Sequence, residues 1–125
     1  MVHKDHIDYY DLLKKLFKSI SEVQAAAIVT SEGFPIASAL PKDVDETVVS
    51  AMISALLSLS KRAVIDMQKG KFEEFCVEGD EGYLLILQVG PNEVLTISTS
   101  KKVKLGLLFL QAKRIFKDLY ESGDY

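Results

Sequence analysis

The sequence has few of the side chains that carry catalysis or bind metals. Its 125 residues include one cysteine, two histidines and no tryptophan. The single cysteine, Cys76, excludes a disulfide within the chain and is compatible with a reducing compartment. The histidines, His3 and His6, stand near Asp5 and Asp8. Without a second cluster of ligands they are weak evidence for a metal site, and a solvated terminus is the favoured interpretation.

Motifs for phosphate binding and for acid–base chemistry are also absent. The chain has no Walker-type loop and no GxGxxG turn, and the glycines of Gly79–Gly82 are typical of a hairpin. The acidic pairs Glu73-Glu74 and Asp80-Glu81 give no sign of the dry pocket that a general acid or base needs. Cys76 has no histidine near it in sequence, which favours a structural thiol over a nucleophile. We therefore expect no enzyme activity and no cofactor.

Arginine is scarce, and the net charge is negative. A charge of −3 and a pI near 5.4 argue against a protein that binds nucleic acid by neutralising phosphates. The two arginines, Arg62 and Arg114, could reach a nucleotide phosphate in a partner GTPase, as arginine fingers do. An ordinary surface position on an amphipathic helix is the favoured alternative for both.

Long hydrophobic runs are missing as well. The start of the chain lacks the apolar region of a secretory signal, and neither end carries a lipidation motif. With 48% hydrophobic and 26% charged residues, the composition is that of a globular protein. We expect one cytoplasmic domain, residues 1–125, without a membrane span.

The chain is organised around a stretch that carries no charge, Thr47–Ser60. We expect a helix here from about Asp45 to Lys69, with Asp43 or Asp45 as its N-cap and Gly70 as its C-cap. Large apolar residues, among them Val48, Val49, Met52, Ile53, Leu56, Leu57 and Leu59, fill one half of the helical wheel. Small residues fill the other half: Thr47, Ser50, Ala51, Ser54, Ala55 and Ser58.

A helix with two uncharged sides needs two covers. If one small sheet covers the apolar half, a second molecule is the natural cover for the small-residue half, which predicts a homodimer or a heterodimer with a related chain. The alternative is a mild Ser/Ala surface exposed to water. A bilayer span is disfavoured because the charge-free run is shorter than the ~17–25 residues required.

Periodicity predicts the remaining elements. Three-to-four-residue spacing of apolar residues indicates a helix at each end, and alternating or continuous apolar runs between turn residues indicate strands. Pro35 places its strand at a sheet edge. Asp5 or Asp8 is the expected cap of the first helix, and Ser100 that of the last. The expected order is helix His6–Ile20, strands Val23–Thr30 and Phe34–Leu40, the long helix, strands Lys71–Glu78, Tyr83–Val89 and Val94–Ser100, and helix Lys101–Glu121.

This pattern resembles the Roadblock family, which includes dynein light chains, MglB-type GTPase regulators and Ragulator-type scaffold subunits. The resemblance rests on the hairpin AAAIVTSEGFPIASAL with Gly33 at its turn, on the Ser/Ala/Leu-rich helix, and on the strands YLLILQV and VLTISTS before a final amphipathic helix. It implies an α+β fold: a five-stranded antiparallel sheet with the long helix on one face and the terminal helices on the other.

The resemblance also implies a dimer and a partner. Family dimers pack their long helices antiparallel and pair their third strands across the axis. Here that would bring Phe72, Glu74 and Cys76 into the interface beside the small-residue face. Family members commonly bind Ras-like small GTPases as scaffolds or regulators, and no family-wide catalytic residue carries over. Residues that could face such a partner are Arg62, Leu107, Leu110 and Arg114.

Two other classes of function remain open at this point. One is a purely structural adaptor, such as a motor light chain or a subunit of a larger assembly without GTPase contact. The other is a small-ligand sensor, which would require a large apolar pocket with convergent polar groups.

Overall fold

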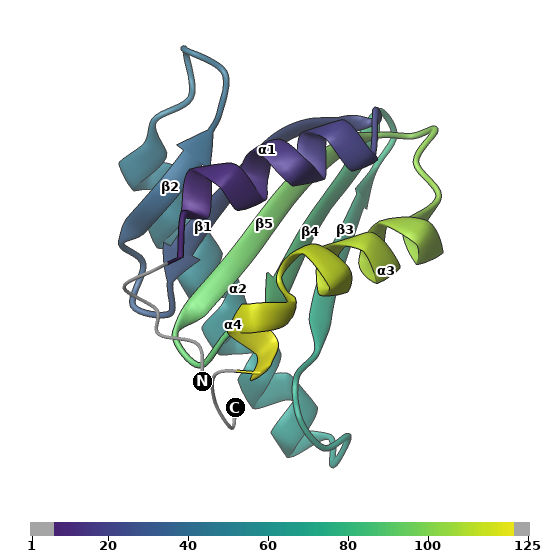
Figure 1. The fold of residues 1–125 in the computed structure, drawn as a ribbon. Helices are drawn as coiled ribbons and strands as arrows, with labels where there is room; N and C mark the ends of the chain where they lie inside the picture. Colours follow the sequence, from purple (N-terminus) through teal and green to yellow (C-terminus); the bar gives the residue numbers. More distant parts are fainter. Residues whose placement is uncertain (1–6, 122–125) are drawn as a thin grey trace.

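The structure, a computed structural model, describes residues 7–121 and contains one five-stranded antiparallel sheet (Figure 1). The strand order is β2-β1-β5-β4-β3. The α+β antiparallel prediction is therefore confirmed. The elements are α1 Tyr9–Ser19, β1 Val23–Thr30, β2 Pro35–Ala39, α2 Glu46–Asp66, β3 Glu74–Gly79, β4 Gly82–Gln88, β5 Glu93–Ser100, α3 Leu105–Ile115 and α4 Lys117–Glu121.

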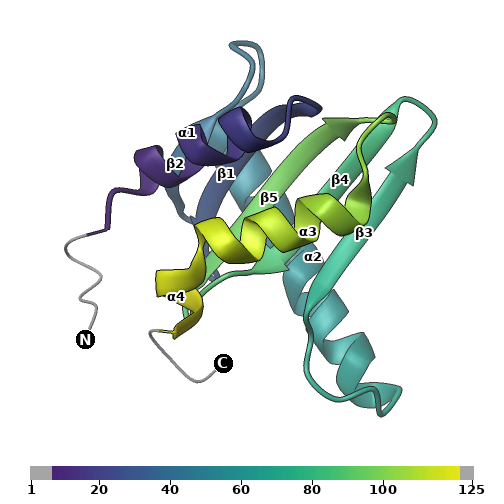
Figure 2. The same cartoon turned by 45° about the vertical axis from the view of Figure 1, so that its right-hand side comes forward.

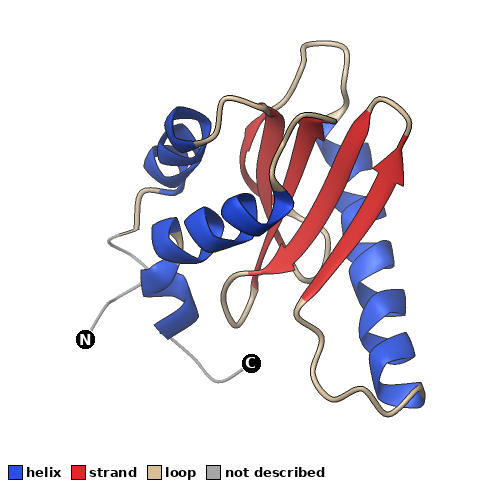
Figure 3. Ribbon diagram, turned by 90° about the vertical axis from the view of Figure 1, so that its right-hand side faces the viewer, coloured by secondary structure: helices blue, strands red, loops and turns tan. Residues whose placement is uncertain are grey.

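Helices cover both faces of the sheet, as predicted. Helices α1, α3 and α4 lie on one face, and α2 crosses the other (Figures 2 and 3). Two separate apolar clusters match these two sides. The larger joins α1, α3 and α4 to alternate strand residues such as Ile28, Leu85 and Ile97. The smaller joins Ile53 and Leu57 of α2 to Ile86 and neighbouring strand residues.

The composition of the strands explains which of them lie at the edges of the sheet and which lie inside it. Strand β2, which contains Pro35, and strand β3, which is rich in Glu, form the two edges of the sheet. A proline cannot donate to a strand ladder, and charges on an edge discourage unwanted pairing. The almost wholly apolar β4 lies between β3 and β5 and is buried over Leu85–Gln88.

The first helix begins where its capping residue predicts. The side chain of Asp8 accepts a hydrogen bond from the backbone N–H of Asp11, at 3.1 Å. The expected start at His6, the alternative cap Asp5 and the two histidines lie outside the described residues. The buried side of α1 presents Leu13 and Leu16 to the sheet.

The long helix is shorter than expected at its C-terminal end. Asp45 caps its start by accepting from the N–H groups of Thr47 and Val48. The helix ends at Asp66, and Gln68 takes the left-handed conformation, with φ +58°. The backbone N–H of Lys69 then bonds the carbonyl oxygen of Val64, which is typical of a helix end. The prediction that Gly70 caps this helix is therefore wrong.

The expected C-terminal helix is divided and starts late. Ser100 does not cap it, because residues 101–102 form a turn in which the N–H of Lys102 bonds the Ser100 hydroxyl at 3.3 Å. The side chain of Val103 is buried in the main core, so the chain dips toward the sheet before α3 begins at Leu105. A second break falls at Phe116, whose fully buried ring separates α3 from α4.

Helix α2 is long and apolar enough, by length and composition alone, to cross a membrane. The sheet argues against such a span. Strand β1 precedes α2 in the chain and strand β5 follows it, yet the two pair side by side from Val23 to Thr30. A helix that crossed a bilayer would leave these strands on opposite sides of it. In this fold the buried apolar residues of α2 instead pack against the sheet.

Candidate interaction surface

Serines, not only large apolar residues, face the sheet from α2. Ser50, Ile53, Leu57 and Ser60 are its buried side chains, and Ser50 is only 1% exposed. The Ser50 hydroxyl donates to the carbonyl oxygen of Glu46 at 2.8 Å, which satisfies it inside the protomer. The prediction that Ser50 lies on a free small-residue face is therefore wrong.

Ser54 also differs from the prediction. It is half-buried, and its hydroxyl donates to the carbonyl oxygen of Ser31 in the β1–β2 turn, at 2.8 Å. Short hydroxyl side chains at these positions let the helix approach the turn closely. The helix is therefore rotated, relative to the predicted wheel, so that serines line part of its inner side.

The outward side of α2 is apolar. It carries Val48, Ala51, Met52, Ala55 and Leu59, which we call the α2 face, with Thr47 and Ser58 exposed at its margin. Val48, Met52 and Leu59 are 59%, 49% and 67% exposed, although the sequence placed them in the core. A row of exposed large apolar side chains on one helix is typical of an interaction surface. Of the predicted small-residue positions, Thr47, Ala51, Ala55 and Ser58 are exposed as expected.

A shallow hollow continues the α2 face onto the sheet. Its volume is about 210 Å³, and its lining is almost entirely apolar. The lining comes from three places: the β2–α2 loop, the start of α2, and strand residues that α2 leaves uncovered, including Val44, Met52 and Leu84. Val77 of β3 pairs with Leu84 and is also exposed, so the apolar surface reaches the sheet edge.

That edge is β3, and it begins later than predicted. Lys71 to Glu73 precede the strand, and Phe72 packs half-buried against the α2-side cluster. Phe72 therefore lies just before the edge strand and not on it, and its place in an interface stays a prediction. Glu74 and Cys76 do lie on β3, and both are exposed.

The charges on β3 affect each other. Although Cys76 is exposed, partial loss of water around its thiol is the main factor that raises its pKa, and the carboxylates of Glu78 and Glu74 raise it further. Burial also raises the pKa of Glu74, against the opposing charge of Lys113 on α3. At the far end of the strand, Glu78 forms an ion pair with Lys101 that holds the pKa of that carboxyl below its usual range.

The four residues proposed to face a partner do not form one surface. Arg62 lies on α2, exposed, 3.5 Å from Asp66. Leu107, Leu110 and Arg114 lie exposed on α3, on the opposite face of the sheet. The structure therefore brings three of the four together and separates Arg62 from them.

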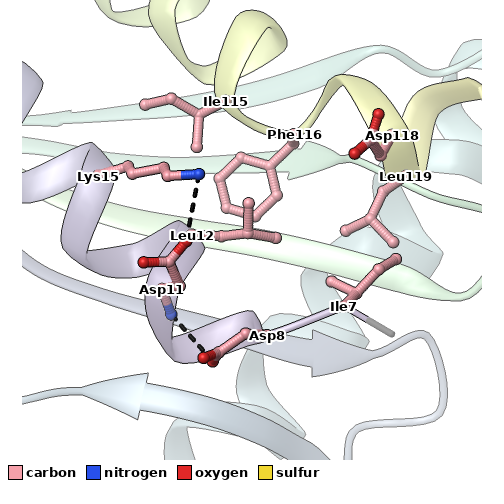
Figure 4. Close-up of a pocket in the computed structure, with 9 residues that line it drawn as sticks. All are labelled: Ile7, Asp8, Asp11, Leu12, Lys15, Ile115, Phe116, Asp118 and Leu119. Atoms are coloured by element: carbon pink, nitrogen blue, oxygen red, sulfur yellow. Dashed lines mark hydrogen bonds and ion pairs between the residues drawn. The ribbon is translucent and has the colours of Figure 1, made fainter. Parts of the chain in front are cut away.

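A second hollow lies between α1 and the α3–α4 junction (Figure 4). It measures about 360 Å³, with Leu12, Phe116 and Leu119 among its apolar lining. Asp8, Asp11, Lys15 and Asp118 also line it, and Lys15 pairs with Asp11 at 3.1 Å. Within residues 7–121, no group of three or more His, Cys, Asp or Glu side chains could hold a metal ion.

The comparisons with known proteins agree with this fold. A family model described as the Roadblock/LC7 domain matches residues 9–99. Three uncharacterised proteins of Methanocaldococcus jannaschii are each 34% identical to the chain over 92 residues. The match covers 74% of this chain and 77–80% of theirs.

Solved structures with the same fold share less sequence. "MglB with tetrameric arrangement" matches with a TM-score of 0.80 at 15% identity, covering 96% of this chain and 90% of that one. Myxococcus xanthus MglB matches with a TM-score of 0.80 at 19% identity, and the match covers 92% of this chain and 96% of that one. A Roadblock/LC7 domain from Streptomyces avermitilis matches with a TM-score of 0.79 at 20% identity, and the match covers 90% of this chain and 92% of that one. At these identities the likeness establishes the fold alone.

Proposed function

Because the chain belongs to the Roadblock/LC7 domain family, we propose that it is a dimeric, non-catalytic cytoplasmic protein that binds a Ras-like small GTPase and scaffolds or regulates it. The observation that carries the dimer is the α2 face. Exposed Val48, Met52 and Leu59 lie on one side of the helix, with only small residues between them. A tetrameric arrangement is named for one MglB structure of the same fold, which supports self-association.

The geometry of such a dimer follows from the sheet. Strand β3 has one paired side, toward β4, and one open side. If two β3 strands pair antiparallel about a twofold axis, the axis stands perpendicular to the sheet, and both α2 helices come to lie on the same side. The two α2 faces can then pack together while the strands join into one sheet. One contact covers both the apolar surface and the open edge.

Sedimentation velocity tests the dimer. We expect the chain to sediment as a dimer at micromolar concentration and Ala55→Glu to sediment as a monomer. Ala55 is exposed in the protomer, so the change should leave the fold intact. A monomeric wild-type chain at these concentrations would contradict the proposal.

Titration against Ras-like GTPases, loaded with GDP or with a GTP analogue, tests the partner. Arg62→Ala and Arg114→Ala should be compared, because these residues lie on opposite faces of the sheet and report which face the GTPase meets. An intact dimer that binds no GTPase in either state would instead favour the structural adaptor. Accelerated GTP hydrolysis lost on removal of either arginine would contradict the non-catalytic assignment.

A further inference from the structure

The net charge of the chain conceals two parts of opposite sign. Residues 8–22 and 101–121, which contain α1, α3 and α4, hold nine Lys or Arg against five Asp or Glu. Residues 23–100, which contain the sheet and α2, hold five Lys or Arg against eleven Asp or Glu. The helical layer opposite α2 is therefore positive, although the chain as a whole is negative.

Ion pairs within the described part of the chain leave most of this positive charge unneutralised. Lys15 pairs with Asp11 at 3.1 Å, Lys117 with Glu121 at 3.8 Å, and Lys101 with Glu78. The remaining cations are exposed and form no ion pair within residues 7–121. They are Lys14, Lys18, Lys102, Lys104, Lys113 and Arg114, which we call the cationic layer.

Apolar side chains project from the same layer. Leu107 and Leu110 are 46% and 50% exposed on α3, and Arg114 follows at helical spacing on the same side. On α1, the exposed Tyr10 lies one turn before Lys14. Helices α1 and α3 lie on the same face of the sheet (Figures 1 and 2), and these side chains are exposed on that layer.

We propose that the α1–α3 layer docks on an anionic membrane surface. Exposed leucines and a tyrosine flanked by lysine and arginine are typical of helices that lie in the headgroup region of a bilayer. Leu107 and Leu110 line neither of the two hollows described above, and they project from the outer side of a helix. A soft lipid interface accommodates such side chains without a matching pocket.

The distribution of charge also suits an extended surface. The backbone N–H of Ser100 bonds the carbonyl oxygen of Glu22, at 3.0 Å, so the end of α1 and the start of α3 share one end of the sheet. Lys18, Lys102 and Lys104 gather at that end, while Asp8 and Asp118 line the hollow at the other. We expect the lysine-rich end to approach the lipid more closely.

This docking goes beyond GTPase binding and leaves the α2 face free. If the proposed dimer forms, the twofold axis places both α1–α3 layers on the same side of the joined sheet. The dimer then binds through two layers at once, and its apparent affinity exceeds that of a monomer.

Vesicle co-sedimentation of the full chain tests the proposal. We expect binding to phosphatidylcholine vesicles containing about 30% phosphatidylserine, and little binding to phosphatidylcholine alone. Binding should weaken as salt rises, because salt screens the headgroup charge. Lys104→Gln with Arg114→Gln should weaken partitioning roughly 25-fold, at about fivefold per cation. Lys42→Gln with Lys69→Gln removes the same charge from exposed positions outside the layer and serves as the control.

The leucines distinguish membrane docking from simple charge attraction. Leu107→Ser with Leu110→Ser should reduce binding to anionic vesicles at physiological salt while leaving the fold intact, since both side chains are half exposed. Ala55→Glu monomers should bind more weakly than dimers but with the same lipid dependence, which separates this test from that of the dimer. Equal binding to neutral vesicles, or equal loss in the control pair, would overturn the proposal. Loss of GTPase binding by Arg114→Gln without any vesicle binding by the wild type would assign the layer to a protein instead.

Discussion

Gly33 in the β1–β2 turn and Ser54 in the middle of α2 are in close contact. A Cβ atom built on Gly33 would lie 3.1 Å from the Cβ of Ser54, and Gly33 has a φ of +98°. The position therefore excludes a side chain for two reasons: the backbone conformation and the approach of the helix. This contact fixes the rotation of α2 about its axis, and hence which residues form the α2 face.

Gly33→Ala should destabilise the fold by about 1–3 kcal/mol, because alanine is strained at positive φ and meets Ser54. Urea unfolding measures the loss. Gly106→Ala is the matched control, since a Cβ there has open space in the first turn of α3. Alanine is the better helix former, so the control should be neutral or stabilising by up to about 1 kcal/mol. Equal effects at both positions would contradict the close contact.

Ala55→Glu should raise the dissociation constant of the dimer at least about 100-fold, because it buries an unpaired carboxylate at the centre of the α2 face. Leu110→Glu provides the control: it puts the same charge on an exposed helix position of the opposite layer. Sedimentation velocity should show a dimer for the control and a monomer for Ala55→Glu. Ser54→Glu is a poorer probe, because it also disrupts the bond to Ser31.

Cys76 should react slowly with iodoacetamide at pH 8. Its pKa is raised, first by partial loss of water around the thiol and then by Glu78 and Glu74, so the thiolate is rarer in the folded chain than in the unfolded one. The pH–rate profile of the folded chain should lie at higher pH than the profile in urea. Glu78→Gln should move it partly back, whereas Glu81→Gln, in the adjacent turn, should not. Coincident folded and unfolded profiles would show that the strand does not perturb the thiol.

Lys101→Ala should raise the pKa of Glu78 toward the usual carboxyl range, because the hydrogen bond and charge of Lys101 are the main causes that lower it. In the wild type, the pair therefore stabilises the fold above the ordinary carboxyl pKa and loses its effect as pH falls through the lowered pKa of Glu78. NMR titration of the Glu78 carboxyl carbon measures this change. Lys102→Ala, one residue along the chain, is the control and should leave the titration unchanged.

Much of the fold could be predicted from the sequence, but the orientation of its central helix could not. Alternation and the turn glycines indicated all five strands, and Pro35 indicated the β2 edge, since these signals are local. In α2 both halves of the wheel are uncharged, so periodicity does not decide which half faces inward. Contact between Ser54 and the β1–β2 turn decides it, and that contact joins residues far apart in sequence. Choosing the wrong half of the wheel is the single reason why Val48, Met52 and Leu59 were placed in the core, although they are exposed.

The C-terminal helix illustrates a second limit. A continuous apolar pattern from Lys101 onward predicted one helix, but burial of Val103 and Phe116 in the main core interrupts it at both places. Helical spacing cannot reveal where a side chain must leave the helix to reach a core. Helical spacing places Val103, Leu107 and Leu110 together outside the buried stripe. Leu107 and Leu110 are exposed as expected, but the prediction for Val103 is wrong, because this residue is buried.

The pairing of β1 with β5 has a consequence for synthesis on the ribosome. Strand β1 emerges early, yet one of its two neighbours begins only at Glu93. At roughly 5–20 residues per second, the β1–β2 hairpin waits about 3–12 s for that neighbour. During this interval an alanine-rich, largely apolar edge stays open to chaperones or to other nascent chains. Neighbouring ribosomes that translate the same message would bring such edges close together.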